Sequence, residues 1–363
     1  MRVLIAGGGT GGHVIPALAI ARELRDAHNA EVRFVGTARG LETRLVPEAG
    51  FHLDLVRSGQ LKNVSMATRL RTAIDLPLGV VECMRLLHEF RPQVVAGVGG
   101  YASGPAMLAA LLLRLPTLAF EPNAVPGLAN RLVGRWVSAA AVNFAQTQRY
   151  FRNARVTGIP VRAEFFTIAP NSAAAPSRLL VFGGSQGARV LNEAMPKIAG
   201  RLLQRFADLE IVHQAGARAA QSTTEAYARA GLSGQQLEQR VRVQPYLDQM
   251  PHEFAAACLL LCRSGASTMA ELGAAGRASL LVPFALAADD HQRRNAEVFL
   301  QAGAARMLTE AELAEPDRLL DELSRLLADP QALGAMGERA RSLARPDAAR
   351  QIATMVVELA RRG

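Results

Sequence analysis

The order of apolar and polar stretches along the chain predicts a protein in which strands and helices alternate. Short apolar runs have the composition of strands buried in a parallel sheet, and they lie at residues 3–6, 32–35, 94–98, 116–120 and 139–144. Longer stretches with apolar residues at helical spacing separate them, for example residues 15–27 and 67–90. This alternation predicts a parallel sheet covered by helices on both faces.

The same pattern starts again in the second half of the chain. A loop rich in Ala, Pro and Ser at residues 171–177 precedes an apolar run, a glycine-rich turn and a helix. Further strands are expected at residues 209–213, 241–243, 259–262 and 279–282. A chain of 363 residues is also longer than one ordinary core. We therefore expect two α/β domains of similar design, with a final helix near residues 347–362 whose apolar stripe suits packing on the first.

Charge is distributed unevenly between the two halves. Residues 1–163 contain 19 Lys and Arg against 10 Asp and Glu, and so hold the whole net charge of +9. A basic surface of this kind suits nucleic acid, anionic lipid or a phosphorylated ligand. The chain has few aromatic residues and no recognisable nucleic-acid motif, so we expect no nucleic-acid partner.

The sequence also indicates whether the chain could span a membrane or lie on its surface. The most apolar later stretch, residues 106–120, is interrupted by an arginine and a proline and is shorter than the roughly 20 residues that a bilayer requires. No signal peptide is recognisable, and the three cysteines suit buried thiols in a cytoplasmic protein. Residues 62–91 fit an interfacial surface on an anionic leaflet as well as they fit an ordinary amphipathic core helix, because apolar side chains there alternate with Arg69, Arg71 and Arg85.

Glycine-rich turns open both halves of the chain. Residues 7–12 and 183–187 each follow an apolar run and precede a helix, an arrangement that exposes backbone N–H groups to phosphate. The first turn also fits the dinucleotide fingerprint. However, the strand at 32–35 ends without the acidic residue that a nicotinamide site uses for ribose. A nicotinamide-dependent oxidoreductase is therefore the less favoured alternative.

Polar residues follow several predicted strands at the edge of the sheet where ligands usually bind. His13 is a candidate general base because imidazole titrates near neutral pH, although a polar residue at a helix start can also serve its own backbone. Residues 262–271 predict a third anion site, with Glu271 either binding a ribose or facing the helix dipole. Asp289, Asp290 and His291 lack the companion ligands of a metal site, so we expect no metal, and Gln292 is a candidate for binding sugar hydroxyls.

Seven motifs along the chain support a resemblance to a known family. They are GGGTGGHVIPAL at residues 7–18, VGGYASGPAMLAA at 98–110, EPNAVPGLANR at 121–131, GIPVR at 158–162, GGSQGAR at 183–189, CRSGASTMAELGAAG at 262–276 and DDHQRRNA at 289–296. In this order they closely resemble the MurG family, the undecaprenyldiphospho-muramoylpentapeptide beta-N-acetylglucosaminyltransferases of peptidoglycan synthesis. Many relatives have His-Glu-Gln-Asn where this chain has Phe-Glu-Pro-Asn at residues 120–123, and GNPVR in place of GIPVR.

The resemblance implies a GT-B architecture, in which two Rossmann-like parallel-sheet α/β domains are separated by a deep cleft. It implies an acceptor and membrane-binding domain at residues 1–160, joined by a C-terminal helix at 341–363. A linker would span residues 161–177 and a UDP-GlcNAc-binding domain residues 164–340. The implied reaction transfers GlcNAc from UDP-GlcNAc, with inversion, to the 4-hydroxyl of MurNAc in lipid I, undecaprenyl-pyrophosphoryl-MurNAc-pentapeptide. The product is lipid II, and no cofactor or metal is needed.

The family's site residues carry over to matching positions of this chain. His13 is the implied general base and Glu121 a second catalytic candidate. The implied contacts of the donor sugar, diphosphate, uracil, ribose and GlcNAc hydroxyls are Thr10, Gly11, Gly12, Asn123, Arg162, Ser185, Leu247, Ala266, Ser267, Thr268, Met269, Ala270, Glu271 and Gln292.

The resemblance also implies a place of work, the cytoplasmic face of the bacterial inner membrane, where the protein would be held peripherally by an anionic surface. Two further alternatives stay open. One is a GT-B glycosyltransferase that uses another UDP-sugar or another lipid acceptor, such as a diacylglycerol. The other is a non-catalytic membrane-associated binder, which the glycine-rich turns in both halves disfavour.

Overall fold

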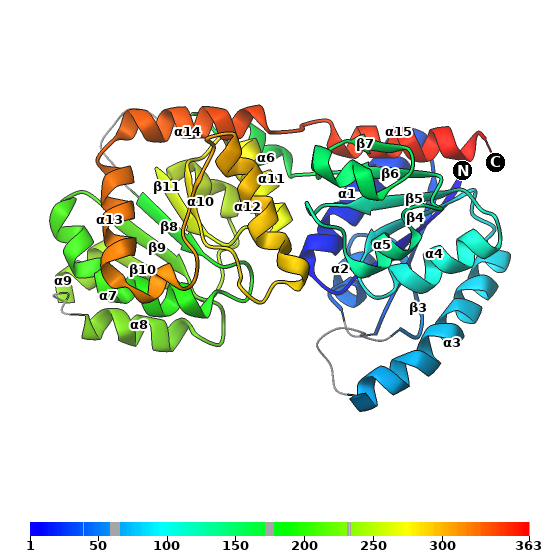
Figure 1. The fold of residues 1–363 in the computed structure, drawn as a ribbon, viewed down its shortest axis with the longest axis horizontal. Coiled ribbons are helices and arrows are strands. Elements are labelled where there is room, and N and C mark those ends of the chain that lie inside the picture. Colours follow the sequence, from blue (N-terminus) through cyan, green and yellow to red (C-terminus); the bar gives the residue numbers. More distant parts are fainter. Residues whose placement is uncertain (39, 59–65, 171–177, 231, 233, 363) are drawn as a thin grey trace. The chain divides into compact units, whose positions relative to one another are not determined.

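The computed structural model describes residues 1–38, 40–58, 66–170, 178–230, 232 and 234–362, with the backbone alone at 66–74 and 235–237. The chain divides into two compact units (Figure 1). The first comprises Met1–Val161 together with Asp347–Gly363, and the second comprises Arg162–Pro346.

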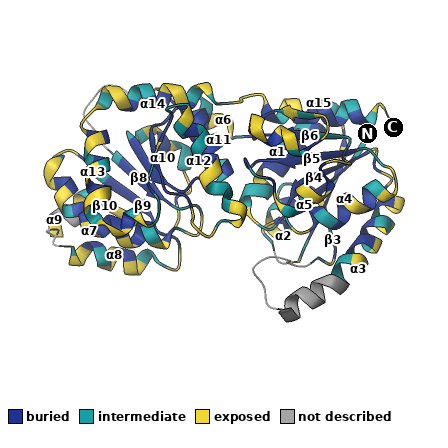
Figure 2. Ribbon diagram, viewed as in Figure 1, coloured by how far each residue is buried: buried dark blue, intermediate teal, exposed yellow. Residues whose placement is uncertain are grey.

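The first unit is built on a seven-stranded sheet in which every pair of neighbours is parallel. Its strands, in the order β3-β2-β1-β4-β5-β6-β7, are β1 (Arg2–Gly7), β2 (Glu31–Gly36), β3 (His52–Leu55), β4 (Val94–Gly99), β5 (Thr117–Glu121), β6 (Ala139–Val142) and β7 (Ala154–Val156). The central strands are buried along almost their whole length, as expected for a parallel sheet covered on both faces (Figure 2).

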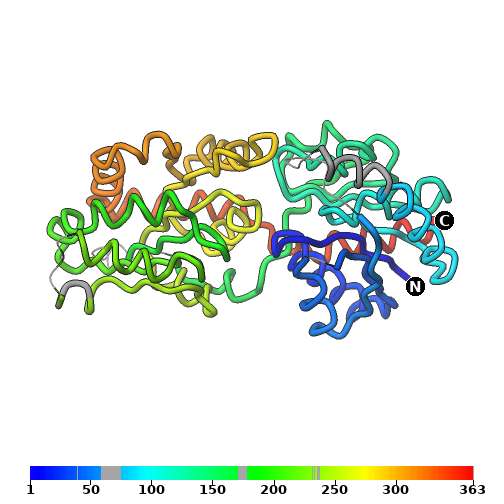
Figure 3. The backbone as a smooth tube through the Cα atoms, turned by 90° about the horizontal axis from the view of Figure 1, so that it is seen from below, coloured from blue at the N-terminus to red at the C-terminus, as the bar shows by residue number. Residues whose placement is uncertain are grey.

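Helices cover both faces of the first sheet. They are α1 (Gly11–His28), α2 (Glu42–Glu48), α3 (Met66–Phe90), α4 (Ser103–Leu112), α5 (Leu128–Val133), the 3-10 helix η1 (Ala145–Tyr150) and α15 (Ala348–Ala360). Helix α3 packs on α4, and α4 packs on α5. The last helix, α15, packs on α1 although more than three hundred residues separate them (Figure 3). Its buried residues Ile352, Met355, Val356 and Leu359 form the apolar stripe expected from the sequence.

The second unit repeats the design with a six-stranded parallel sheet of order β10-β9-β8-β11-β12-β13. Its strands are β8 (Arg178–Phe182), β9 (Glu210–Gln214), β10 (Val241–Gln244), β11 (Leu259–Cys262), β12 (Ser279–Leu281) and β13 (Arg306–Met307). The helices around it are α6 (Ala163–Phe166), α7 (Arg189–Arg205), α8 (Ala220–Arg229), α9 (Gly234–Arg240), α10 (Met250–Ala256), α11 (Ala266–Ala275), α12 (His291–Gln301), α13 (Pro316–Leu327), α14 (Pro330–Ser342) and the 3-10 helices η2 (Ala288–Asp290) and η3 (Glu312–Ala314).

The predicted fold class, two parallel-sheet α/β domains, is confirmed, but three strands were missed. These strands, β3, β7 and β13, all lie at an edge of a sheet. Each is short, and most of its residues are only partly buried or exposed. An edge strand therefore lacks the continuous apolar run by which a central strand is recognised.

The boundaries between the units differ in detail from those expected. Residues 341–346 pack with the second unit, so the C-terminal helix of the first unit is α15 and does not begin at 341. Within the expected linker, residues 163–166 form α6, which packs on α10 and α11 of the second unit. The last part of that expected linker, residues 171–177, lies outside the described residues.

Candidate functional site

The first glycine turn is held by the carboxylate of Glu42, a residue that the sequence analysis did not single out. The backbone N–H of Gly9 donates to Glu42 Oε2 at 2.7 Å. Thr37 donates to Oε1 through both its backbone N–H and its hydroxyl, each at 3.0 Å. The side chain of Glu42 is buried, with 1% exposure. The turn after β1 is thus tied to the end of β2 by one carboxyl group.

Three glycines leave the space that the Glu42 carboxylate fills. A Cβ atom would stand 2.2 Å from Glu42 Cδ at Gly8, 2.6 Å from Cγ at Gly36 and 1.9 Å from Oε2 at Gly40. An acidic group therefore does lie at the end of β2, where the sequence showed none. Since it is buried and accepts hydrogen bonds from the protein itself, it is not placed to bind a ribose.

His13 lies at the start of α1 with its ring against β4. Its Nδ1 atom is 3.0 Å from the carbonyl oxygen of Val98. A Cβ atom on Gly99, where φ is +91°, would stand 2.7 Å from the ring. Because a carbonyl oxygen only accepts hydrogen bonds, the neutral imidazole carries its proton on Nδ1, and Nε2 is its basic nitrogen.

The three implied sugar contacts of the first turn lie beside His13. Thr10 caps α1 with an extended backbone and is exposed, and its side chain makes no capping hydrogen bond. Gly11 and Gly12 are the first residues of α1 and are partly exposed. The structure therefore brings Thr10, Gly11, Gly12 and His13 together at the carboxyl end of β1.

Glu121 holds the loop that carries Asn123. Its Oε1 atom accepts from the backbone N–H of Asn123 at 3.0 Å and from the side-chain amide of Asn123 at 3.2 Å. Its Oε2 atom accepts from Gly127 N and from the Asn130 amide, each at 3.0 Å. Burial raises the pKa of Glu121, and these hydrogen bonds oppose that shift. A carboxylate with 2% exposure and four donors suits the positioning of Asn123 better than the catalytic role that the resemblance implied.

The second glycine turn follows β8 and begins α7. Gly184 and Gly187 have φ of +86° and +72°, which L side chains rarely adopt. Gly187 is also in close contact with the turn after β9, because a Cβ atom added at this position would lie 1.9 Å from Ala215 O. Ser185 is exposed at the tip of the turn. It is therefore accessible for the diphosphate contact expected of it.

A third group surrounds the start of α11. Gly265 caps this helix, and the residues after it follow the order expected from the sequence. Ser267, Thr268 and Ala270 are partly exposed, whereas Ala266 and Met269 are buried and offer mainly their backbone. Burial raises the pKa of Glu271 to about 7, and the positive charge of Arg162 opposes this shift. Arg162 caps α6 and lies over the Phe165 ring at 5.1 Å.

The two remaining implied contacts, Leu247 and Gln292, are both anchored by hydrogen bonds. Leu247 N donates to Gln214 Oε1 at 3.2 Å, so its carbonyl oxygen is the backbone group that we expect to meet uracil. Gln292 Oε1 accepts from Phe284 N at 3.0 Å, an arrangement that leaves Nε2 as the donor for a sugar hydroxyl. Ser264 Oγ donates to the backbone carbonyl of Gln292 at 2.8 Å and ties α12 to the end of β11.

Gln214 and His213, which the sequence analysis did not single out either, end strand β9. Both side chains are buried, and both hydrogen-bond to neighbouring segments. A sequence signal existed, since two polar residues close an apolar strand at the edge where parallel sheets bind ligands.

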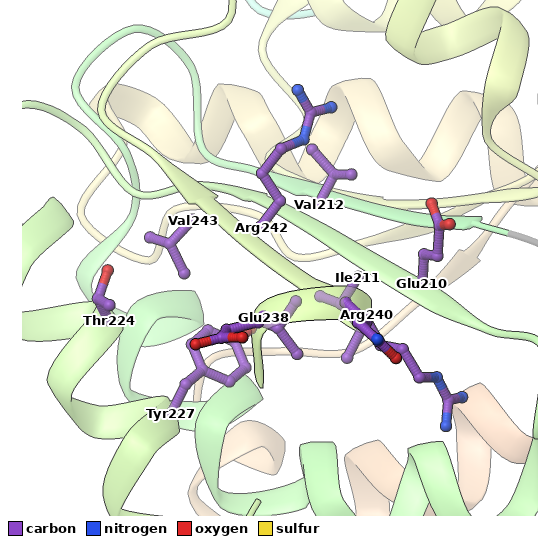
Figure 4. A pocket seen from close by; sticks show the side chains of 11 residues that line it. Glu210, Ile211, Val212, Thr224, Tyr227, Glu238, Arg240, Arg242 and Val243 are labelled. Carbon is purple, nitrogen blue, oxygen red and sulfur yellow. The ribbon is translucent and has the colours of Figure 1, made fainter. Parts of the chain in front are cut away.

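Elsewhere in the second unit, a cavity of about 440 Å³ lies against β9 and β10 beside α8 and α9 (Figure 4). The residues that line it are Glu210, Ile211, Val212, Thr224, Tyr227, Glu238, Gln239, Arg240, Val241, Arg242 and Val243. None of the predicted site residues is in this lining. Among the side chains that the structure describes, no group of three or more His, Cys, Asp or Glu could hold a metal ion.

Comparison with known families accounts for both units. The profile of the glycosyltransferase family 28 N-terminal domain matches residues 3–142, and the profile of the C-terminal domain of the same family matches residues 178–352. The chain belongs to glycosyltransferase family 28. The family 28 profiles include every predicted site residue except Arg162, which lies between the two matched ranges.

Named relatives align with this chain over nearly its whole length. A UDP-N-acetylglucosamine--N-acetylmuramyl-(pentapeptide) pyrophosphoryl-undecaprenol N-acetylglucosamine transferase of Solibacter usitatus is 43% identical over 99% of this chain and 96% of its own. The protein of the same name from Nitrosococcus oceani is 43% identical over 99% of both chains. These relatives confirm the resemblance on which the sequence analysis relied.

Solved structures agree with this assignment. The crystal structure of Acinetobacter baumannii MurG has a TM-score of 0.81 and 29% identity, covering 98% of this chain and 99% of its own. The glycotransferase of kitacinnamycin has a TM-score of 0.72 at 19% identity, covering 99% and 98%, and is similar in fold. The predicted enzyme class, a glycosyltransferase, is confirmed by the family 28 match.

Proposed function

We propose that this chain transfers GlcNAc from UDP-GlcNAc to the 4-hydroxyl of MurNAc in undecaprenyl-pyrophosphoryl-MurNAc-pentapeptide, and so forms lipid II for peptidoglycan synthesis. The observation that carries the proposal is the 43% identity, over 99% of the chain, with transferases named for this donor and acceptor. The geometry of the two units suggests which groups perform each part of the reaction.

The second unit supplies the groups suited to the donor. The glycine turn with Ser185, the start of α11 and the guanidinium of Arg162 all belong to this unit. We expect their N–H groups and positive charge to stabilise the diphosphate as its bond to GlcNAc breaks. Glu271 would accept hydrogen bonds from the ribose hydroxyls, and Gln292 would donate to a hydroxyl of GlcNAc. Stabilisation of this kind needs no bound metal, so we expect transfer to continue in the presence of a chelator.

The first unit supplies the candidate base. Nε2 of His13 would accept the proton of the MurNAc 4-hydroxyl as its oxygen attacks C1 of GlcNAc. The bond between C1 and the phosphate oxygen breaks in the same step, and its electron pair leaves with UDP. The new bond forms on the face opposite the leaving group, which inverts the configuration at C1. Thr10, Gly11, Gly12 and Asn123 are the contacts that we expect for the donor sugar.

Exposed apolar side chains on the first unit support a peripheral membrane location for the reaction. Helix α3 exposes Leu78 and Val81, and α4 exposes Leu108 and Leu112. Trp136, just after α5, is 70% exposed. Helix α3 packs on α4, and α4 packs on α5. The whole net charge of +9 lies in residues 1–163. A surface that combines apolar side chains with positive charge suits an anionic leaflet.

The predicted interfacial segment, residues 62–91, is described only in part. Arg69 and Arg71 lie outside the described side chains, and Lys62 lies outside the described residues. Within the helices that the structure describes, none is long and apolar enough to cross a bilayer. From the exposed apolar side chains, we propose contact with the cytoplasmic leaflet through α3, α4 and the segment around Trp136.

The experiment that tests the function is a transfer assay with purified protein, labelled UDP-GlcNAc and a short-chain analogue of the lipid acceptor. We expect label to move to the lipid in a one-to-one ratio with released UDP, with or without chelator. UDP-glucose and UDP-GalNAc, offered at the same concentration, would be poor donors. Transfer that requires a different sugar or a diacylglycerol acceptor would overturn the proposal in favour of another glycosyltransferase activity.

A further inference from the structure

We infer that Gln214 is a positioning residue for the donor, because it fixes the distance between the glycine turn of the second unit and the segment that carries Leu247. The inference rests on the proposed function, since it assumes that the second unit binds the UDP part of UDP-GlcNAc. It goes further by naming a residue, outside the expected contacts, that makes one site from two separate segments.

The side-chain amide of Gln214 bridges the two segments directly. Its Nε2 atom donates to the carbonyl oxygen of Gly184 at 2.8 Å, and its Oε1 atom accepts from Leu247 N at 3.2 Å. The residue is 2% exposed, so neither partner is readily replaced by water. A carboxylate cannot donate, and an asparagine is one methylene shorter, so a glutamine suits both partners.

The backbone after Gln214 is enclosed by the same two segments. Ala215 N donates to Gln244 O, at the end of β10, at 2.9 Å. On the other side, Gly187 and Gly216 lie so close to the opposite backbone that a Cβ atom on either would clash. It would lie 1.9 Å from Ala215 O at Gly187 and 2.1 Å from Gln186 O at Gly216. A shift of the glycine turn relative to β9 would therefore disturb both contacts.

A buried chain of hydrogen bonds also holds the turn that follows β9. Asn192 Nδ2 donates to Ala215 O at 2.9 Å, so Asn192 Oδ1 faces the ring of His213 and accepts from Nε2 at 3.0 Å. Nδ1 of His213 then accepts from the hydroxyl of Tyr227 at 3.0 Å. Burial lowers the pKa of His213 to about 3, so the ring stays neutral and the direction of the chain is fixed.

This rigidity matters for a ligand that must reach both segments at once. A nucleoside diphosphate would place its base at Leu247 and its phosphates at the turn that contains Gly184. If the two segments are already at the right distance, binding does not have to order them. Of these two segments, uridine would touch only the one that carries Leu247, so it would gain nothing from the bridge. Gln214 should therefore increase the affinity for UDP more than the affinity for uridine.

The test compares UDP and uridine binding to the full chain by isothermal titration. Gln214→Glu keeps an acceptor for Leu247 N and replaces the donor to Gly184 O with a second oxygen. We expect the Kd for UDP to rise about tenfold and the Kd for uridine to change by less than about twofold. Gln214→Met, which adds no charge, should also raise the Kd for UDP, and this rise should persist at high salt.

A matched control separates the bridge from a general effect of charge. Gln204→Glu makes the same change on an exposed side chain of α7 and should leave the Kd for UDP at the wild-type value. In transfer assays, Gln214→Glu should raise the KM for UDP-GlcNAc about tenfold with a kcat within about threefold of wild type.

The outcomes distinguish two kinds of failure. If the wild-type chain does not bind UDP, the proposed function itself fails. If the wild-type chain binds UDP and both Gln214 variants keep its Kd, the positioning role of Gln214 is wrong. A lower stoichiometry at an unchanged Kd would show that part of the variant is unfolded, and this too would contradict the role. An equal weakening in the Gln204→Glu control would replace the bridge with simple charge repulsion.

Discussion

The Nδ1 atom of His13 and the carbonyl oxygen of Val98 are joined by a hydrogen bond of 3.0 Å between the start of α1 and the end of β4. The partner is a neutral carbonyl, so it fixes the tautomer and orientation of the ring without adding a negative charge. The structure thus directs the basic Nε2 atom of His13 by means of the backbone.

This relationship predicts the behaviour of two substitutions at His13. Asparagine can still donate from its side-chain amide to Val98 O, whereas alanine cannot, and neither can act as a base near neutral pH. Both should lower kcat by about 10²- to 10⁴-fold, the range typical of a lost general base, and leave UDP binding unchanged. His28→Asn, at the other end of α1, is the control. A kcat near the wild-type value in His13→Asn between pH 6 and 9 would exclude the base role.

Glu42 should support turnover without contacting the substrate. In Glu42→Gln an amide group replaces one of the two oxygens that accept from Gly9 and Thr37, which leaves a buried donor without its acceptor. We expect the free energy of unfolding to fall by about 1–3 kcal/mol and kcat to fall about tenfold or more as the turn beside His13 loosens.

The same helix provides the control for Glu42. Glu48→Gln makes an identical change on an exposed residue of α2 and should alter the free energy of unfolding by less than about 0.5 kcal/mol. Denaturant unfolding and steady-state kinetics measure both effects. Wild-type kcat in Glu42→Gln, at a stability that keeps the protein folded, would show that the buried carboxylate does not position the turn.

The KM for the donor should depend on pH through Glu271. Burial raises the pKa of Glu271 to about 7, so the side chain is largely protonated at pH 6 and ionised at pH 8. The ionised form can accept from each ribose hydroxyl with a separate oxygen, whereas protonation turns one of these oxygens into a donor. The KM for UDP-GlcNAc should therefore fall as the pH rises from 6 to 8, with a midpoint near 7. This fall should be absent in Glu271→Gln.

The same shift gives a stability effect of defined sign. The folded chain holds the Glu271 proton up to a higher pH than the unfolded chain, whose carboxyl has a pKa near 4.5. The contribution of Glu271 to the free energy of unfolding is therefore present below pH 4.5 and is lost as the pH rises through 7. A KM for the donor that does not change with pH in the wild-type protein would contradict the ribose role and the pKa together.

The exposed apolar side chains of the first unit should determine membrane binding. Trp136→Ser combined with Leu112→Ser removes two exposed apolar groups, each of which would contribute about 1.5–3 kcal/mol if it were buried in lipid. Co-sedimentation with phosphatidylglycerol vesicles should fall at least tenfold. Leu286→Ser, at a residue of the second unit that is 78% exposed, should bind like wild type. Equal binding of wild type and double variant, or equal binding to neutral vesicles, would contradict this location.

The sequence predicted the parts of the fold that depend on continuous patterns. Central strands such as β1 and β4 are apolar along almost their whole length. The turns that follow them contain glycines, which determine the backbone conformation of the turn itself. Edge strands such as β3 carry no such pattern. The motifs also place the candidate site residues near the carboxyl ends of strands, because most of the motifs stand directly after a strand of a parallel sheet.

The sequence could not show which polar side chains hydrogen-bond to the protein's own loops and turns. Glu42 follows β2 by several residues, and only the folded chain brings it beneath Gly9. Glu121 stands in a motif that suggests chemistry, yet its four hydrogen bonds show that it organises the loop of Asn123. Gln214 belongs to no motif, and its two partners lie 30 and 33 residues away along the chain.

The most direct test of the account is a titration of UDP-GlcNAc into the full chain and into two variants, one in each unit. We predict one bound donor per chain and a Kd for UDP-GlcNAc raised about tenfold by Glu271→Gln. In a parallel titration with UDP, which lacks the sugar that the first unit would contact, the Kd for Glu42→Gln should stay within about twofold of wild type. That pattern would assign the nucleotide to the carboxyl edge of the second sheet. Failure of UDP-GlcNAc to bind, or binding that Glu42→Gln abolishes and Glu271→Gln leaves intact, would contradict the account.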